Sequence, residues 1–133
     1  MKLKHLILFF ALSLTCSCFA QDRFLESDVV MDHDTMFLKK EMHKITAIVY
    51  NKHGDIGYFE NGLREGLHKE WYHNGNIKLE VHYKNGKMHG LRTEWYKSGH
   101  KWSEQQMEDG YVVSGRHFYN DGTEITHGNF LKH

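Results

Sequence analysis

The sequence predicts an all-β fold, an elongated single-layer antiparallel β-meander built from hairpin repeats. The chain of 133 residues has 12 glycines, no proline and 14% aromatic residues, a composition typical of strands joined by many turns. Apolar and polar residues alternate in segments such as Ile77–Tyr83, as expected of half-buried strands. Six turn-forming dipeptides recur in rhythm, and they are Asn61-Gly62, Asn74-Gly75, Asn85-Gly86, Ser98-Gly99, Asp109-Gly110 and Asp121-Gly122.

The first 20 residues predict a signal peptide that is cleaved after Ala20. A short basic start precedes the apolar run Leu6–Leu14 and a stretch of small residues. A membrane anchor needs about 20 apolar residues, and this run ends too early. We therefore expect an exported protein, periplasmic or secreted. The alternative is an outer-envelope lipoprotein, in which a lipidated Cys18 associates the protein with a membrane.

The charge balance excludes the usual class of nucleic-acid-binding protein. The chain has 17 basic and 17 acidic residues, and removal of residues 1–20 leaves 15 basic and 17 acidic ones. Proteins that bind nucleic acids neutralise phosphates with an excess of Lys and Arg. Both cysteines, Cys16 and Cys18, lie in the predicted signal peptide. The exported domain is therefore expected to depend on strand pairing and packing rather than on disulfides.

The turns define a repeat of about 24 residues whose copies can be aligned. Glu70–Gly75 recurs as Glu94–Gly99 and, after the loss of one residue, as His117–Gly122. Gly66 and Gly90, inside the predicted strands, are expected to let an aromatic ring lie flat on the backbone. The alignment predicts two aromatic ladders on opposite faces of the sheet, one of Trp71, Trp95 and Phe118, the other of Tyr72, Tyr96 and Tyr119.

The alignment also divides the chain. Residues 1–20 are the signal peptide, residues 21–49 an N-terminal leader that caps one edge of the sheet, and residues 50–133 the repeat domain. An open sheet has an unpaired edge at each end, which leaves a homodimer through the edges as an option.

The string Tyr83–Gly90, followed by Glu94, Trp95, Tyr96 and Gly99, resembles the variant MORN repeat (membrane occupation and recognition nexus). It is similar in particular to the bacterial class commonly labelled antitoxin or immunity proteins. The resemblance covers about residues 50–130. It implies a curved single-layer sheet that binds proteins or lipids without catalysis, and the antitoxin label implies a toxin partner neutralised by direct contact.

Tyrosine side chains are the preferred candidates for binding, because they combine an apolar ring with a polar tip. We expect contacts from Tyr72, Tyr96 and Tyr119, and from Trp102, which stands where the preceding repeat has Lys78. The ladder carboxylates Glu70 and Glu94 are included in this predicted surface. On an open sheet we expect them to be exposed and to pair with Lys69 or Arg92.

Catalytic and metal sites find little support in the sequence. An open sheet has no cleft in which an acid, a base and a nucleophile converge, so we expect no enzyme activity and no cofactor. Eleven histidines remain after cleavage, but His68 aligns with Arg92 and His89 with Glu65. Such polar positions predict surface histidines rather than zinc ligands.

The function predicted from the sequence is that of a non-catalytic exported repeat protein. It is expected to bind a partner protein along its sheet, with toxin neutralisation as one version. The alternative is a scaffold that associates with the membrane or cell envelope by binding lipid or glycan.

Overall fold

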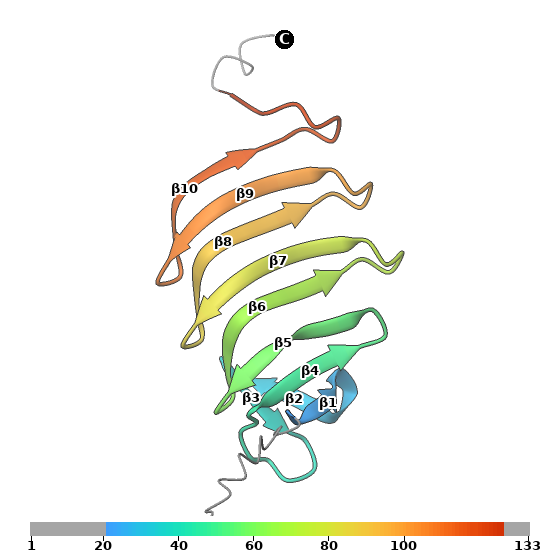
Figure 1. Ribbon diagram of the computed structural model, residues 1–133, viewed down its shortest axis with the longest axis vertical. Coiled ribbons are helices and arrows are strands. Elements are labelled where there is room, and N and C mark those ends of the chain that lie inside the picture. The colour runs from blue at the N-terminus through green and yellow to red at the C-terminus, as the bar shows by residue number, and fades with distance from the viewer. Residues whose placement is uncertain (1–20, 127–133) are drawn as a thin grey trace, which may run out of the picture.

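The computed structural model describes residues 21–126, so the predicted signal peptide lies outside the described residues. These residues form an open eight-stranded sheet in the order β1-β4-β5-β6-β7-β8-β9-β10 (Figure 1). Neighbouring strands are antiparallel, except that β1 pairs parallel with β4. The predicted all-β antiparallel meander is therefore confirmed. The strands are β1 (Arg23–Leu25), β4 (Ala47–Asn51), β5 (Gly54–Glu60), β6 (Leu63–Trp71), β7 (Ile77–Lys84), β8 (Lys87–Trp95), β9 (Lys101–Glu108) and β10 (Tyr111–His117).

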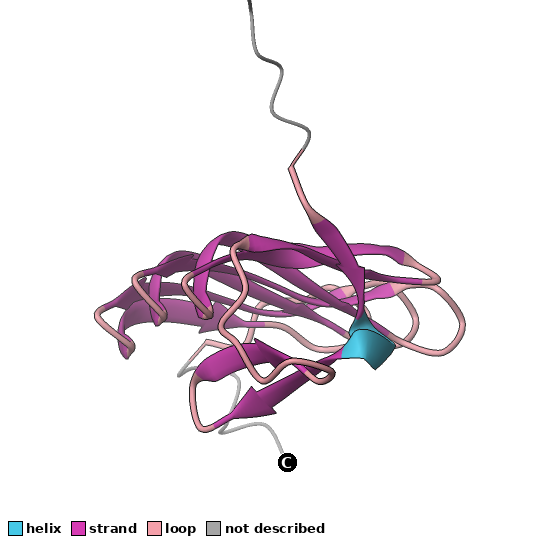
Figure 2. Ribbon diagram, turned by 90° about the horizontal axis from the view of Figure 1, so that it is seen from below, coloured by secondary structure: helices cyan, strands magenta, loops and turns pink. Residues whose placement is uncertain are grey.

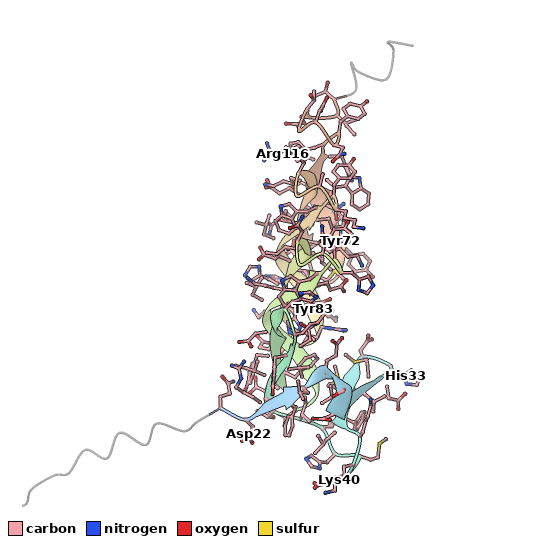
Figure 3. All side chains as sticks on the ribbon, turned by 90° about the vertical axis from the view of Figure 1, so that its right-hand side faces the viewer. Asp22, His33, Lys40, Tyr72, Tyr83 and Arg116 are labelled. Carbon is pink, nitrogen blue, oxygen red and sulfur yellow. The ribbon has the colours of Figure 1, made fainter. Side chains whose placement is uncertain are left out.

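A separate hairpin covers one face of the sheet at its N-terminal end. It consists of β2 (Val29–Asp32) and β3 (Thr35–Leu38), which follow the 3-10 turn η1 (Glu26–Asp28). Figures 2 and 3 show the hairpin lying to one side of the sheet. This end of the molecule therefore has two layers, and burial of apolar area between them stabilises the fold. The buried core consists of Val29, Ile45, Ala47, Val49 and Phe59.

Two kinds of turn alternate along the sheet. At Asn61-Gly62, Asn85-Gly86 and Asp109-Gly110 both residues have positive φ, from 50° to 82° in the first two pairs and 48° and 91° in the third. Two successive positive φ angles are the requirement of a type I′ hairpin turn, which Asn-Gly and Asp-Gly meet best. At the other three dipeptides only the glycine has positive φ. The chain thus reverses by a tight turn at one side of the sheet and by a longer turn at the other.

The tight turns also connect one repeat to the repeat before it. Gly86 N–H donates to the carbonyl of Arg64 at 2.9 Å, and Gly110 N–H donates to that of Met88 at 2.8 Å. The two donors are 24 residues apart, and so are the two acceptors. Each repeat therefore docks its turn on the first strand of its predecessor.

Cross-strand pairing sorts the side chains onto two faces. The hairpin face carries Val49 and Phe59, which pack against the β2–β3 hairpin, and continues through His68, Val81, Arg92, Glu94 and Ser103. The opposite face carries Ile48, Tyr58, Leu67, Lys69, Glu80, Thr93 and Glu104. Lys69 and Glu80 pair across the strands there at 3.0 Å.

The expected role of the strand glycines is wrong. No atom lies within 4 Å of the place where a Cβ of Gly66 would stand, and at Gly90 the nearest atom is the Cβ of His82 at 3.6 Å, so no ring covers either backbone. Both residues have positive φ, 71° and 93°. The physical reason for glycine at these positions is this backbone conformation, which other residues adopt only with strain.

Candidate functional site

The predicted tyrosines lie in the longer turns, directly after the strands. The hydroxyl of Tyr72 donates to the carbonyl of Trp95 at 2.8 Å, and that of Tyr96 donates to the carbonyl of Phe118 at 2.9 Å. Each of these tyrosines therefore connects its own repeat to the next one. Their role in binding stays a prediction, but their hydroxyls are already engaged within the fold.

Tyr119 is the third copy and differs from the first two. Its side chain is 40% exposed, and its backbone forms the same turn, with its N–H bonded to the carbonyl of Thr123 at 2.8 Å. Within residues 21–126 its hydroxyl has no carbonyl acceptor from a following repeat. Of the three tyrosines, it is the one that presents its polar tip outward.

The two ladder carboxylates have different surroundings. Glu94 accepts hydrogen bonds from Arg92 at 2.7 Å and from the fully buried Ser103 at 2.8 Å, and its side chain is only 18% exposed. The predicted pairing with Arg92 is confirmed, but the expected exposure is wrong, because neighbouring side chains of the hairpin face cover the pair. Glu70 pairs with Lys78 at 3.1 Å instead of with Lys69, and this contact raises the pKa of the Lys78 ammonium.

The expectation of a surface position is also wrong for His68, which is 4% exposed. Its ring packs edge-on against Phe59 and Tyr83, with centroids 5.0 and 5.1 Å away. Its Nε2 lies 2.8 Å from the carbonyl of Tyr58, which only accepts, so Nε2 carries the proton. Burial lowers the pKa of the imidazole to about 4. His68 is therefore a neutral core residue near neutral pH.

Exposed apolar side chains gather on the last strands of the sheet. We define the C-terminal patch as Trp102, Tyr111, Val112, Val113 and Tyr119, which are between 40% and 77% exposed. Every residue of β10 is exposed. Large exposed apolar groups that lie close together are a feature of interaction sites.

The outer side of β10 is largely free within residues 21–126. β10 is the last strand of the sheet and pairs with β9 on its inner side. On its outer side, the only contacts of the described chain are near its C-terminal end, where Phe118 bridges to Glu124 and Ile125 N–H donates to the carbonyl of His117 at 2.8 Å. Figure 1 shows β10 as the final arrow of the stack. Its remaining backbone groups form an open edge.

A cleft of about 570 Å³ adjoins this edge. Trp102 forms one wall and contacts the ring of His117, with centroids 6.3 Å apart. Arg116 lies over the ring of Phe118 and is paired with Glu104 at 2.6 Å, so that its charge is fixed at the rim. The lining residues are Trp102, Gly115, Arg116, His117, Glu124, Ile125 and Thr126.

A second cleft, of about 580 Å³, lies on the opposite face at the N-terminal end. Trp71, from the predicted tryptophan ladder, lines it and stacks on His53 with centroids 6.1 Å apart. Asp55 in this cleft already pairs with Arg23, and Lys69 pairs with Glu80. The charged groups of this cleft are thus neutralised within the fold.

The described residues offer little for metal chemistry or for crossing a membrane. Nowhere in residues 21–126 do three or more His, Cys, Asp or Glu side chains lie together as metal ligands. The same part of the chain contains no helix of the length and apolarity needed to cross a bilayer. What the arrangement offers chemically is apolar contact and backbone hydrogen bonding at the C-terminal patch.

Comparison with known proteins adds no identity to this geometry. No family model, no curated protein and no solved structure matches the chain. The resemblance to MORN repeats therefore stays a prediction from the sequence.

Sequence reasoning missed the most exposed part of the patch, Tyr111–Val113. A signal was present, because the preceding copy has Lys87, Met88 and His89 at the corresponding positions. Replacement of two polar residues by strand-forming apolar ones in the last copy is the pattern of a strand that meets a partner.

Proposed function

We propose that this chain is an exported, non-catalytic module that binds a partner protein through the C-terminal patch, with toxin neutralisation as one version. The observation that carries this proposal is the open edge of β10, where all seven residues are exposed and Tyr111, Val112 and Val113 are 77%, 53% and 55% exposed. Extended segments of partner proteins commonly add to such edges, with affinity from the backbone and specificity from side-chain pockets.

The cleft beside β10 supports the same proposal. Tryptophan and arginine are enriched where protein interfaces bind tightly, and Trp102 and Arg116 both line this cleft. Arg116 is held in place by Glu104, so it loses less side-chain freedom on binding. The export part of the proposal rests on the sequence of residues 1–20.

Affinity capture with variants of the exported chain tests this proposal. We expect one defined protein to co-purify with the natural chain and to be lost with Trp102→Ala and with Val113→Lys. Both residues are exposed, so these changes are expected to alter the free energy of unfolding by at most about 0.5 kcal/mol.

The matched control is Trp71→Ala, which removes a tryptophan from the cleft on the opposite face. It is expected to retain the partner. Retention by Val113→Lys together with loss by Trp71→Ala would contradict the proposal and move the binding site to the opposite face. Capture of no defined protein would contradict it altogether.

A further inference from the structure

We infer that the element bound at the C-terminal patch is a β-hairpin of the partner protein, closed by a tight turn that contains glycine. This inference rests on the proposed function and names the structural class of the partner's binding segment. Its basis is the way in which each repeat of the chain holds the next one, because the last described repeat presents the same groups.

The first of these groups is a backbone carbonyl. The carbonyl of Arg64 accepts from Gly86 N–H, and the carbonyl of Met88 accepts from Gly110 N–H. The residue 24 positions further on is Val112, on the edge strand. No later tight turn of residues 21–126 donates to its carbonyl. Val112 thus has the position of a turn acceptor at the end of the stack.

The second group is the tyrosine hydroxyl on the other side of the sheet. Tyr72 and Tyr96 each donate to a carbonyl of the following repeat, at 2.8 and 2.9 Å. Tyr119 forms the same turn, and the described chain offers its hydroxyl no such acceptor. A hairpin that lies across the end of the sheet would present a carbonyl at this place.

The third group is the edge between these two points. In the preceding repeat, Gly90 to Trp95 of β8 pair with β9, whose chain then enters the Asp109-Gly110 turn. The corresponding stretch of β10 pairs with no strand on its outer side. A single extended strand would satisfy this edge, but only a hairpin with a tight turn also reaches the carbonyl of Val112.

Glycine in the partner's turn follows from the geometry of the internal turns. Gly86 and Gly110 have φ of 80° and 91°, a region that other residues enter only with strain. Gly86 also lies against Leu63, since a Cβ there would be 3.3 Å from the leucine Cδ2. Tyr111 holds the position of Leu63 two repeats later and is 77% exposed. Its ring is placed to contact the incoming turn.

A synthetic hairpin tests the inference directly, because the inference concerns the shape of the bound element. The probe is the peptide Ile77–Trp95, which contains β7, the Asn85-Gly86 turn and β8. It is titrated into the isotope-labelled full exported chain, followed by NMR. We expect shifts of the backbone amides of Tyr111–His117 and of Tyr119, and none at Ile48 or Tyr58.

The matched control peptide carries Gly86→Ala. Alanine at positive φ is strained, so we expect about tenfold weaker binding. In the chain, Tyr119→Phe is expected to weaken binding of the natural-sequence peptide by about fivefold, because one hydrogen bond is lost. Tyr72→Phe is expected to leave the affinity unchanged, since its hydroxyl is engaged inside the stack.

Three results would overturn the inference: no shifts at β10, shifts confined to the opposite face, or equal binding of the two peptides. Such a result combined with capture of a protein partner that Val113→Lys abolishes would leave the proposed function standing and reject only the hairpin. Failure of both experiments would reject both.

Discussion

Gly57 lies directly against the imidazole of His68: a Cβ atom on residue 57 would stand 2.4 Å from the histidine Nδ1. This distance is far inside van der Waals contact, so the absence of a side chain at 57 is what allows the histidine to enter the core. His68 in turn contacts Phe59 and Tyr83, and so joins the N-terminal core to the repeats.

Gly57→Ala is therefore expected to destabilise the protein by about 2 kcal/mol, as overpacking of a core does. Denaturant unfolding measures this loss. In a His68→Ala background the same glycine substitution is expected to cost much less, because the clashing ring is gone. Equal losses in the two backgrounds would show that the contact is not the cause.

His68 is also expected to make stability depend on pH. Its pKa is about 4 in the folded protein, against 6.5 for an ordinary histidine, so the unfolded chain binds the proton more readily. The free energy of unfolding should fall by about 3 kcal/mol as the pH drops from 6.5 to 4, with no further loss from this group at lower pH. Unfolding curves of the natural protein and of His68→Phe measure the difference, which removes the effect of other groups. Parallel pH profiles would contradict the assignment.

The inter-repeat tyrosine bonds predict unequal effects of one substitution at two equivalent positions. Tyr72→Phe removes the bond to the carbonyl of Trp95 and is expected to lower the free energy of unfolding by about 1 kcal/mol. Tyr119→Phe, at the end of the described stack, is expected to change it by less than about 0.5 kcal/mol. Thermal or denaturant unfolding of the two variants checks this, and losses of the same size would refute it.

The buried hydroxyl of Ser103 predicts a larger loss. Ser103→Ala removes a hydrogen bond to the carboxylate of Glu94 at a position with no solvent exposure, and about 2 kcal/mol of stability should be lost. The matched control is Ser98→Ala in an exposed turn, for which a change below about 0.5 kcal/mol is expected. A small effect at Ser103 would mean that Glu94 is satisfied by Arg92 alone.

The sequence predicted the strands and turns because both depend on local chemistry. Asn-Gly and Asp-Gly pairs favour positive φ wherever they occur, and alternation of apolar and polar residues marks strands without reference to distant parts of the chain. For the same reason it correctly paired Glu94 with Arg92, two residues apart on one face of a strand. It failed where burial is decided by distant residues, as at His68, which aligns with the polar position of Arg92.

By itself, then, the sequence determined the β-meander, its rhythm of turns and the repeat of about 24 residues. Only the tertiary structure decided which copies of each repeated residue are buried and which are exposed. The reason is that copies with the same local sequence have different neighbours: Tyr72 and Tyr96 are each followed by another repeat, whereas Tyr119 and β10 stand at the end of the described stack. Likewise, the β2–β3 hairpin covers one end of one face, and no local pattern in residues 29–38 specifies that contact.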